Sequence, residues 1–232
     1  MSGKLFLIPS FLGEDNPSII TQQAKVAVDA LDIFIVENAR TARRFLRAIG
    51  YKKNFDTEVT IHEMDKHTAK QNFELLFREV LAGKNAGIIS EAGNPCIADP
   101  GSELVAVAHK NNIEIVPLVG PSSILLALIA SGFNGQKFSF HGYLPIDSSE
   151  KIKAIRRLEA AAGSGATQIF METPFRNQKL LEEILNACKE ETKLCVACDL
   201  TLPTQFIRTK KIRDWKNEKV DLNKRYCIFL MG

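Results

Sequence analysis

One stretch of the chain, residues 86–102 with the sequence AGIISEAGNPCIADPGS, constrains the fold more than any other. It opens with an uncharged run over 86–90 that has the length of one buried strand. Gly-Asn-Pro at 93–95 follows, and residues of these types turn a chain and leave backbone N–H groups bare. Asp99 is then a good N-cap, and Pro100 suits the first position of a helix. The stretch therefore predicts a strand, a loop of small residues and a helix start.

Such a loop allows a ligand to approach the backbone closely. We expect an anion bound there to meet free N–H groups and the positive end of the helix dipole. The alternative is an ordinary strand-to-helix connection with a good cap, and the spacing alone supports both interpretations equally.

Short apolar runs alternate with amphipathic segments along the chain. The expected strands are 4–8, 33–36, 58–62, 86–90, 113–118, 137–141, 167–171, 193–199, 205–208 and 226–230. One helix is expected to start at Asn16. Further helices are expected at 41–49, 69–82, 102–110, 124–130, 147–162 and 177–189. This alternation predicts an α/β fold with parallel β-α units, in which ligands bind beyond the carboxyl ends of the strands.

The spacing of the expected strands and helices changes near residue 118. We therefore predict an N-terminal α/β domain over 1–118 and a C-terminal α/β domain over 119–232. In the second domain, 124–130 is almost entirely apolar and predicts a fully buried helix. The strands at 193–199 and 205–208 are expected to pair antiparallel at a sheet edge.

Composition limits the class of protein. Of the 232 residues, 45% are hydrophobic and 25% are charged, which is typical of a folded domain. The net charge of +3 permits an RNA partner without requiring one. Five cysteines at irregular spacing fit a reducing cytoplasm, and the N-terminus carries no pattern of a secretory signal.

One segment has almost the length of a membrane span. Residues 115–133 carry no charge, but Pro117, Gly120 and Pro121 would break a single helix there. We therefore expect a strand, a tight turn and a helix, and no membrane span.

The common phosphate and metal motifs are absent. The chain has neither G-x-G-x-x-G nor G-x-x-x-x-G-K-[ST], which disfavours a nucleotide dehydrogenase or an NTPase. Cys195 and Cys198 form a C-x-x-C, but a strand would point them to opposite faces and no second ligand pair follows. We expect no metal site.

The histidines share no motif, and the basic residues form three clusters. Of His62, His67, His109 and His141, His109 lies in the middle of an expected helix and is expected to be structural, whereas His141 at a strand end is a candidate for a cleft. The basic clusters are Arg40, Arg43, Arg44 and Arg47; Lys151, Lys153, Arg156 and Arg157; and Arg208, Lys210, Lys211 and Arg213. They are either solvated faces or, if they converge, a phosphate-binding surface.

Several motifs together resemble one family. They are VENARTARRFL, GIISEAGNPCIADPG, VPLVGPSS, FHGYLP and IFMETPFRNQKLLEEIL, in this order. The chain resembles the tetrapyrrole-methylase superfamily of S-adenosylmethionine-dependent methyltransferases. Within it, the chain is most similar to the ribosomal RNA small-subunit methyltransferase I branch, which methylates a cytidine ribose 2′-hydroxyl.

The resemblance implies a two-domain class III methyltransferase fold with a mostly parallel first sheet and a mixed second sheet. It also implies S-adenosylmethionine in the cleft between the domains, a homodimer, and ribosomal RNA or the small ribosomal subunit as partner. The positions that match the cofactor site are Pro9, Ala92, Gly93, Asn94, Pro95, Ile97, Ala98, Asp99, Ser122, Ser123, Met171, Glu172, Leu200 and Thr201. The candidates for RNA contact are Arg40, Arg43 and Arg44. A ribose hydroxyl would also need a general base, for which Glu37, Glu91 and His141 are candidates.

The chain departs from the family pattern in three places. IPSFLGEDN at 8–16 replaces a loop of the TPIGN type, VENAR at 36–40 replaces AEDTR, and CDLTLPTQ at 198–205 replaces RELTK and its following glutamate. Methyl transfer remains the favoured activity despite these changes. The sequence leaves open which position of the RNA is methylated. The alternatives are a small-molecule, tetrapyrrole-type C-methyltransferase and a non-catalytic cofactor-binding module that binds RNA or protein.

Overall fold

The computed structural model describes residues 2–13, 15–64 and 73–232, with the backbone alone for 73–76. Its contacts divide the chain into two units, Met1–Ser122 and Ser123–Gly232. The sequence placed this division at 118/119, in the same connection between a strand and a helix. His67 and the first part of the helix expected at 69–82 lie outside the described residues.

The first unit is built on a parallel five-stranded sheet. Its strands are β1 (Lys4–Ile8), β2 (Ile33–Val36), β3 (Thr60–Glu63), β4 (Ala86–Ile89) and β5 (Glu114–Pro117), in the order β3-β2-β4-β1-β5. The inner strands β2 and β4 are buried along their whole length. They are apolar without alternation because helices cover both faces of a parallel sheet.

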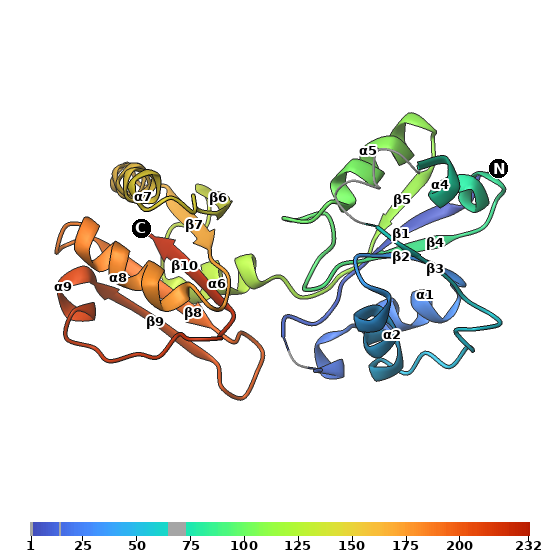
Figure 1. Cartoon of the computed structure of the whole chain (residues 1–232), viewed down its shortest axis with the longest axis horizontal. Helices are drawn as coiled ribbons and strands as arrows, with labels where there is room; N and C mark the ends of the chain where they lie inside the picture. Colours follow the sequence, from blue (N-terminus) through green and yellow to red (C-terminus); the bar gives the residue numbers. More distant parts are fainter. Residues whose placement is uncertain (1, 14, 65–72) are drawn as a thin grey trace. The chain divides into compact units, whose positions relative to one another are not determined.

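Helices lie on both faces of this sheet (Figure 1). They are α1 (Gln22–Asp29) and α2 (Ala39–Ala48) on one face, and α4 (Phe73–Leu81) and α5 (Gly101–Lys110) on the other. The expected helix start at Asn16 is wrong: a single 3-10 turn over Pro17–Ile19 comes first, and Thr21 caps α1 by accepting Ala24 N–H. The Asn16 side chain makes no such cap.

The second unit contains a mixed five-stranded sheet. Its strands are β6 (Phe138–Tyr143), β7 (Thr167–Met171), β8 (Lys193–Cys198), β9 (Phe206–Lys211) and β10 (Cys227–Met231), in the order β6-β7-β10-β8-β9. Only the β6–β7 pair is parallel. The predictions of a parallel first sheet, a mixed second sheet and an antiparallel edge pair are therefore confirmed.

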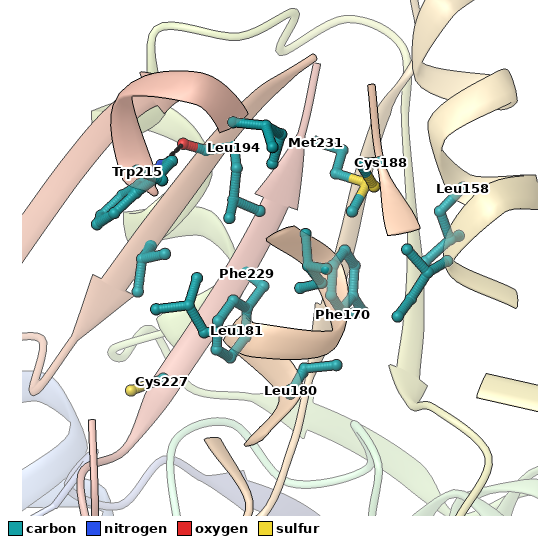
Figure 2. Close-up of a cluster of buried hydrophobic side chains, with 14 of the residues drawn as sticks. Leu158, Phe170, Leu180, Leu181, Cys188, Leu194, Trp215, Cys227, Phe229 and Met231 are labelled. Carbon is teal, nitrogen blue, oxygen red and sulfur yellow. Dashed lines mark hydrogen bonds between the residues drawn. The ribbon is translucent and has the colours of Figure 1, made fainter. Parts of the chain in front are cut away.

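One face of the second sheet carries the larger core (Figure 2). Helices α7 (Ser148–Gly163), α8 (Asn177–Ala187) and α9 (Ile212–Trp215) pack there. The rings of Phe170 and Phe229 stack at 5.9 Å, and the Trp215 indole N–H donates to the carbonyl oxygen of Leu194 at 2.9 Å. A buried indole needs such an acceptor, so this bond fixes the short helix α9 on the sheet.

Helix α6 (Ser123–Ser131) contacts β8, β9 and β10. The side chains of β8 and β10 that alternate with the Figure 2 core are also buried, which places α6 over the opposite face. The expectation of a fully buried helix is wrong: Ala127 and Leu128 are buried, but Ile129 is 77% exposed. Uniform apolar composition could not show which side of this helix packs.

Candidate functional site

Three loops follow the carboxyl ends of the neighbouring strands β4, β1 and β5, and they pack against one another. Ser10 N–H donates to the carbonyl oxygen of Gly93 at 2.9 Å, and Gly93 N–H donates to the carbonyl oxygen of Phe11 at 3.1 Å. A Cβ atom on Gly120 would lie 2.1 Å from Cβ of Pro9. Only glycine therefore allows these loops to approach this closely. The structure therefore places the loop after β1, which carries Pro9, against the loop 90–100.

Asp99 holds the loop 90–100 in its shape. Its carboxylate oxygens accept Cys96 N–H at 2.9 and 3.0 Å, and Oδ1 accepts Gly101 N–H at 2.7 Å. Cys96 and Ala98 have φ values of +71° and +62°, and such left-handed backbone costs roughly 1–3 kcal/mol at a non-glycine residue unless its surroundings stabilise it. Burial raises the pKa of the Asp99 carboxyl, and the two N–H donors oppose that shift.

These hydrogen bonds occupy the part of the expected anion site that lies at the helix start. The N–H groups of Gly93, Cys96 and Gly101 all have acceptors within the chain. Pro100, not Asp99, is the N-cap residue of α5, and the Asp99 carboxylate occupies the position at the helix start where an anion would bind. A second anion there would meet a like charge, so the helix dipole is already used by the chain itself.

Other amides of the loop remain available. In the described part of the chain, no hydrogen-bond acceptor is found for the N–H groups of Ala92, Asn94, Ile97 and Ala98. Ala92, Ile97 and Ala98 are exposed, and Pro95 is buried. The loop thus presents backbone donors and small or apolar side chains, which suits a ligand with both polar and apolar parts.

The thiol within this loop is not a nucleophile at neutral pH. Cys96 is half-buried, and burial together with the nearby Asp99 raises the pKa of its thiol to about 11. Nucleophilic chemistry needs the thiolate. Cys96 is therefore a packing residue.

The serine pair expected at the next contact turn falls on the division between the units. Ser122 is buried and ends the first unit, and Ser123 is the first residue of α6 in the second unit.

In the second unit, the end of β8 carries strained backbone. Asp199 and Thr201 have φ values of +50° and +74°, and Leu200 between them is buried. The Asp199 Oδ2 atom accepts Arg225 Nε–H at 2.8 Å and the Thr204 hydroxyl at 2.9 Å. A charged network therefore holds the predicted Leu200–Thr201 segment in place.

The end of β7 is tied to a buried ionic network. Met171 ends the strand, and Glu172 follows with a buried carboxylate that accepts Arg176 Nη2–H at 2.6 Å. Lys151 is also buried, with Nζ 3.2 Å from Glu183 Oε2 and 3.8 Å from Glu172 Oε2. The sequence grouped Lys151 with a basic surface, but the structure assigns it to this interior. The Glu172 carboxylate is similarly committed to its neighbours.

The structure brings two of the three candidate bases together. Glu37 Oε1 accepts Glu91 N–H at 3.2 Å, and Glu91 Oε1 accepts the Thr41 hydroxyl at 2.5 Å. Both carboxylates follow parallel strands, so they share the carboxyl edge of the first sheet. His141 lies on β6 of the second unit, where Nε2 is 2.8 Å from Gln168 Oε1.

Comparison with known proteins identifies the family. The family model described as Tetrapyrrole (Corrin/Porphyrin) Methylases matches residues 12–215. The chain belongs to the tetrapyrrole methylase family. Methyl transfer is the chemistry of this family, and the loops that follow β4 and β5 lie within the matched range.

Curated relatives of this methylase match nearly the whole chain. A protein of Vibrio cholerae is 32% identical over 88% of this chain and 67% of its own length. Proteins of Escherichia coli O157:H7 and Bacillus subtilis are each 30% identical over 99% of this chain, and over 77% and 75% of their own lengths. All three are named ribosomal RNA small subunit methyltransferase I.

Solved structures share the fold of this methylase at low sequence identity. The methyltransferase CobJ superposes with a TM-score of 0.64 at 18% identity, over 100% of this chain and 94% of CobJ. Diphthine synthase superposes with a TM-score of 0.71 at 11% identity, over 99% and 89% of the two chains. These similarities establish the two-sheet methylase fold.

The basic residues of the methylase differ in whether their side chains are engaged with other groups of the chain. On α2, Arg44 pairs with Asp15, Arg43 lies over the Phe55 ring, and Arg47 donates to backbone carbonyls of the following loop. Arg40 is exposed and forms no ion pair with a described residue. In the basic cluster at 208–213, Arg208 and Lys210 form ion pairs with Glu218, and Lys211 and Arg213 form ion pairs with Glu191.

Within the described ranges, no three His, Cys, Asp or Glu side chains are grouped as metal ligands. Cys195 and Cys198 are both fully buried on β8, and of the two, Cys198 belongs to the core that α7, α8 and α9 cover. The described helices include none that could span a membrane.

Two features of the site were not found from the sequence. The close contact of Gly120 with Pro9 has only a weak signal, the Gly-Pro dipeptide at 120–121. The ion pair of Asp199 with Arg225 joins residues far apart in the chain, so no local pattern reveals it.

Proposed function

We propose that this methylase transfers a methyl group from S-adenosylmethionine to a ribose 2′-hydroxyl of small-subunit ribosomal RNA. The observation that carries the proposal is the match, over nearly the whole chain, to several proteins named for methylation of that RNA. The first-unit loops are consistent with it, because they combine unpaired amides with apolar cover.

We assign the methyl donor to the loop 90–100 and its neighbours. The free amides of Ala92, Asn94, Ile97 and Ala98 fit its polar groups, and Gly93 permits close approach. When bound, S-adenosylmethionine supplies an activated methyl group on a sulfonium. The other assigned positions are Pro9, Pro95, Asp99, Ser122, Ser123, Met171, Glu172, Leu200 and Thr201. Because its carboxylate is paired, Glu172 would contribute through its backbone.

The chain's own task is alignment and removal of a proton. A ribose hydroxyl becomes a better nucleophile as a general base accepts its proton. We assign this role to Glu37 or Glu91 at the carboxyl edge of the first sheet, since Glu91 N–H orients the Glu37 carboxylate and the Thr41 hydroxyl orients the Glu91 carboxylate. His141 is the alternative base.

We further propose that Arg40, Arg43 and Arg44 contact the RNA backbone, and that the enzyme acts as a homodimer in the cytoplasm, where ribosomal subunits assemble. Arg40 is the strongest of the three, because its charge is not shared with a described carboxylate. Sedimentation of the purified protein tests the dimer.

The function is tested with methyl-labelled S-adenosylmethionine and small ribosomal subunits that lack the modification. We expect label in the RNA, in a dinucleotide that resists alkaline hydrolysis because a 2′-O-methyl group blocks attack on the adjacent phosphate. Label in a tetrapyrrole instead would assign a small-molecule methyltransferase. Calorimetric binding of S-adenosylhomocysteine without turnover on either substrate would assign a non-catalytic module.

The assignment of the general base is tested with the variants Glu37→Gln, Glu91→Gln and His141→Gln. Thr41→Val, which removes the hydroxyl that donates to Glu91 Oε1, is the control for that hydrogen bond. Loss of a general base lowers kcat by about 100- to 10,000-fold and removes the acidic limb of the pH–rate profile. Unchanged profiles in both glutamate variants would exclude this assignment.

A further inference from the structure

Two aromatic side chains are exposed on adjoining segments of the second unit. Phe175 is 75% exposed and Tyr226 is 54% exposed. Lys224 N–H donates to the carbonyl oxygen of Pro174 at 3.0 Å, and Asn177 Nδ2–H donates to that of Arg225 at 2.6 Å. The segments that carry the two rings therefore lie side by side, although neither ring contributes to the core.

Hydrogen bonds hold both segments in place. Arg176 N–H donates to the carbonyl oxygen of Thr173 at 2.9 Å, which closes a turn around Phe175. The backbone of Tyr226 is held by Asp199, because the Tyr226 carbonyl oxygen accepts Asp199 N–H at 2.8 Å. Rings on an ordered backbone lose little conformational entropy when a partner binds.

The charges around the rings are arranged with the cations outward. The Arg176 side chain is 36% exposed, while that of its partner Glu172 is fully buried. Arg225 is 24% exposed, against 10% for Asp199. Lys224 is exposed, and no described carboxylate pairs with it. The charged side chains that are at least partly exposed beside the two rings are therefore Lys224, Arg176 and Arg225 against Asp221 on the same segment. This net positive charge complements a polyanion.

Among polyanions, a single nucleic-acid strand uses both features. Unpaired bases stack on aromatic side chains, and the backbone phosphates pair with Lys and Arg. A duplex keeps its bases stacked inside and offers only its phosphates. The surface also adjoins Glu172 and Asp199, which flank the proposed methyl-donor residues Met171 and Leu200.

We propose that Phe175 and Tyr226, with Lys224, Arg176 and Arg225, form an aromatic surface that binds unpaired bases of the RNA substrate. This inference rests on the proposed function, which it deepens by naming single-stranded RNA as the recognised form. Phe175 and Tyr226 supply the stacking faces, and the cations hold the adjoining phosphates.

The test measures the affinity of the full chain for a fluorescent single-stranded RNA oligonucleotide and for the same sequence in a duplex. Phe175→Ala and Tyr226→Ala should each weaken single-strand binding by about 5- to 20-fold, as the loss of one stacked base does. Duplex affinity should not change. Phe175→Trp should bind as the wild type does, as should Ile146→Ala, which alters another exposed apolar side chain of the same unit.

Unchanged single-strand affinity in both alanine variants would overturn the proposal. So would a loss of dimer in sedimentation with RNA affinity intact, because the surface would then join two copies of the chain. Methylation of small subunits is followed in parallel. If the wild type methylates RNA but the variants bind the oligonucleotide normally, only this inference fails. If the wild type methylates no RNA while the variants lose binding, the surface stands and the proposed function fails.

Discussion

At the residue scale, Gly93 is the position where the loop 90–100 least tolerates a side chain. Its φ is +72°, and a Cβ atom would lie 3.1 Å from Leu12 Cδ2 and 3.4 Å from the Pro121 carbonyl oxygen. We expect Gly93→Val to weaken S-adenosylhomocysteine binding by more than about tenfold, since both the backbone and its neighbours must shift. Isothermal titration calorimetry measures this loss.

Gly50→Ala is the matched control for Gly93. Gly50 also has a left-handed backbone, with φ of +102°, but a Cβ atom there meets nothing within 4 Å. It should cost stability without changing cofactor affinity. Equal affinities in the Gly93 variant and the wild type would remove the loop from the cofactor site.

Tyr51 links stability to alkaline pH. Its hydroxyl donates to the Leu31 carbonyl oxygen at 2.7 Å, and burial and nearby carboxylates raise its pKa from 10.0 to about 12. The folded state therefore retains the proton longer than the unfolded chain does. This contribution to stability is complete below pH 10 and is lost as the pH rises toward 12.

Tyr51→Phe should lower the free energy of unfolding by about 1–2 kcal/mol at pH 8, because a buried hydrogen bond is lost. Between pH 10 and 12 the variant should lose less stability than the wild type. Urea unfolding at several pH values measures both effects, and parallel curves for the two proteins would contradict the prediction.

At the element scale, one carboxylate shapes the connection from β4 to α5. Asp99→Ala leaves Cys96 N–H and Gly101 N–H without their acceptor and should weaken S-adenosylhomocysteine binding about tenfold or more. Asp99→Asn should retain more affinity, because one amide oxygen still accepts Gly101 N–H and burial already disfavours the carboxylate charge.

Asp147→Ala provides the comparison in the other unit. Asp147 caps α7 by accepting Ser149 N–H and Glu150 N–H, so its loss should cost about 1 kcal/mol of stability. Cofactor affinity in calorimetry should stay at the wild-type value. If the two aspartate variants behaved alike, the effect at Asp99 would be general destabilisation.

At the scale of the whole molecule, charge pairing separates possible RNA contacts from structural ion pairs. Arg40→Gln should weaken RNA binding and reduce the slope of log affinity against log salt by about one, as the loss of one phosphate contact does. Arg213→Gln should change neither quantity, because its partner Glu191 is itself 64% exposed and presents a negative charge at the same surface. Filter binding at several salt concentrations distinguishes them, and equal slopes in both variants would contradict an RNA role for Arg40.

Much of the architecture was predictable from local pattern. The β7 bounds agree with the expected strand, and the apolar runs of β2 and β4 indicated buried parallel strands. The start of α1 was not predictable, because Asn16 and Thr21 both suit an N-cap and only packing selects Thr21. Four-residue α9 is too short for any helical period.

The sequence by itself determined the alternation of strands and helices, the family, and which loops carry small residues, because these depend on residue types at short spacing. Only the tertiary structure decided where charges and amides are paired. It placed Lys151 in the interior, the Asp99 carboxylate on the amides expected to be free, and the Glu37 carboxylate against Glu91. Such pairings join residues distant in the chain, and their energies depend on burial and on distances of a few ångströms, which local patterns do not encode.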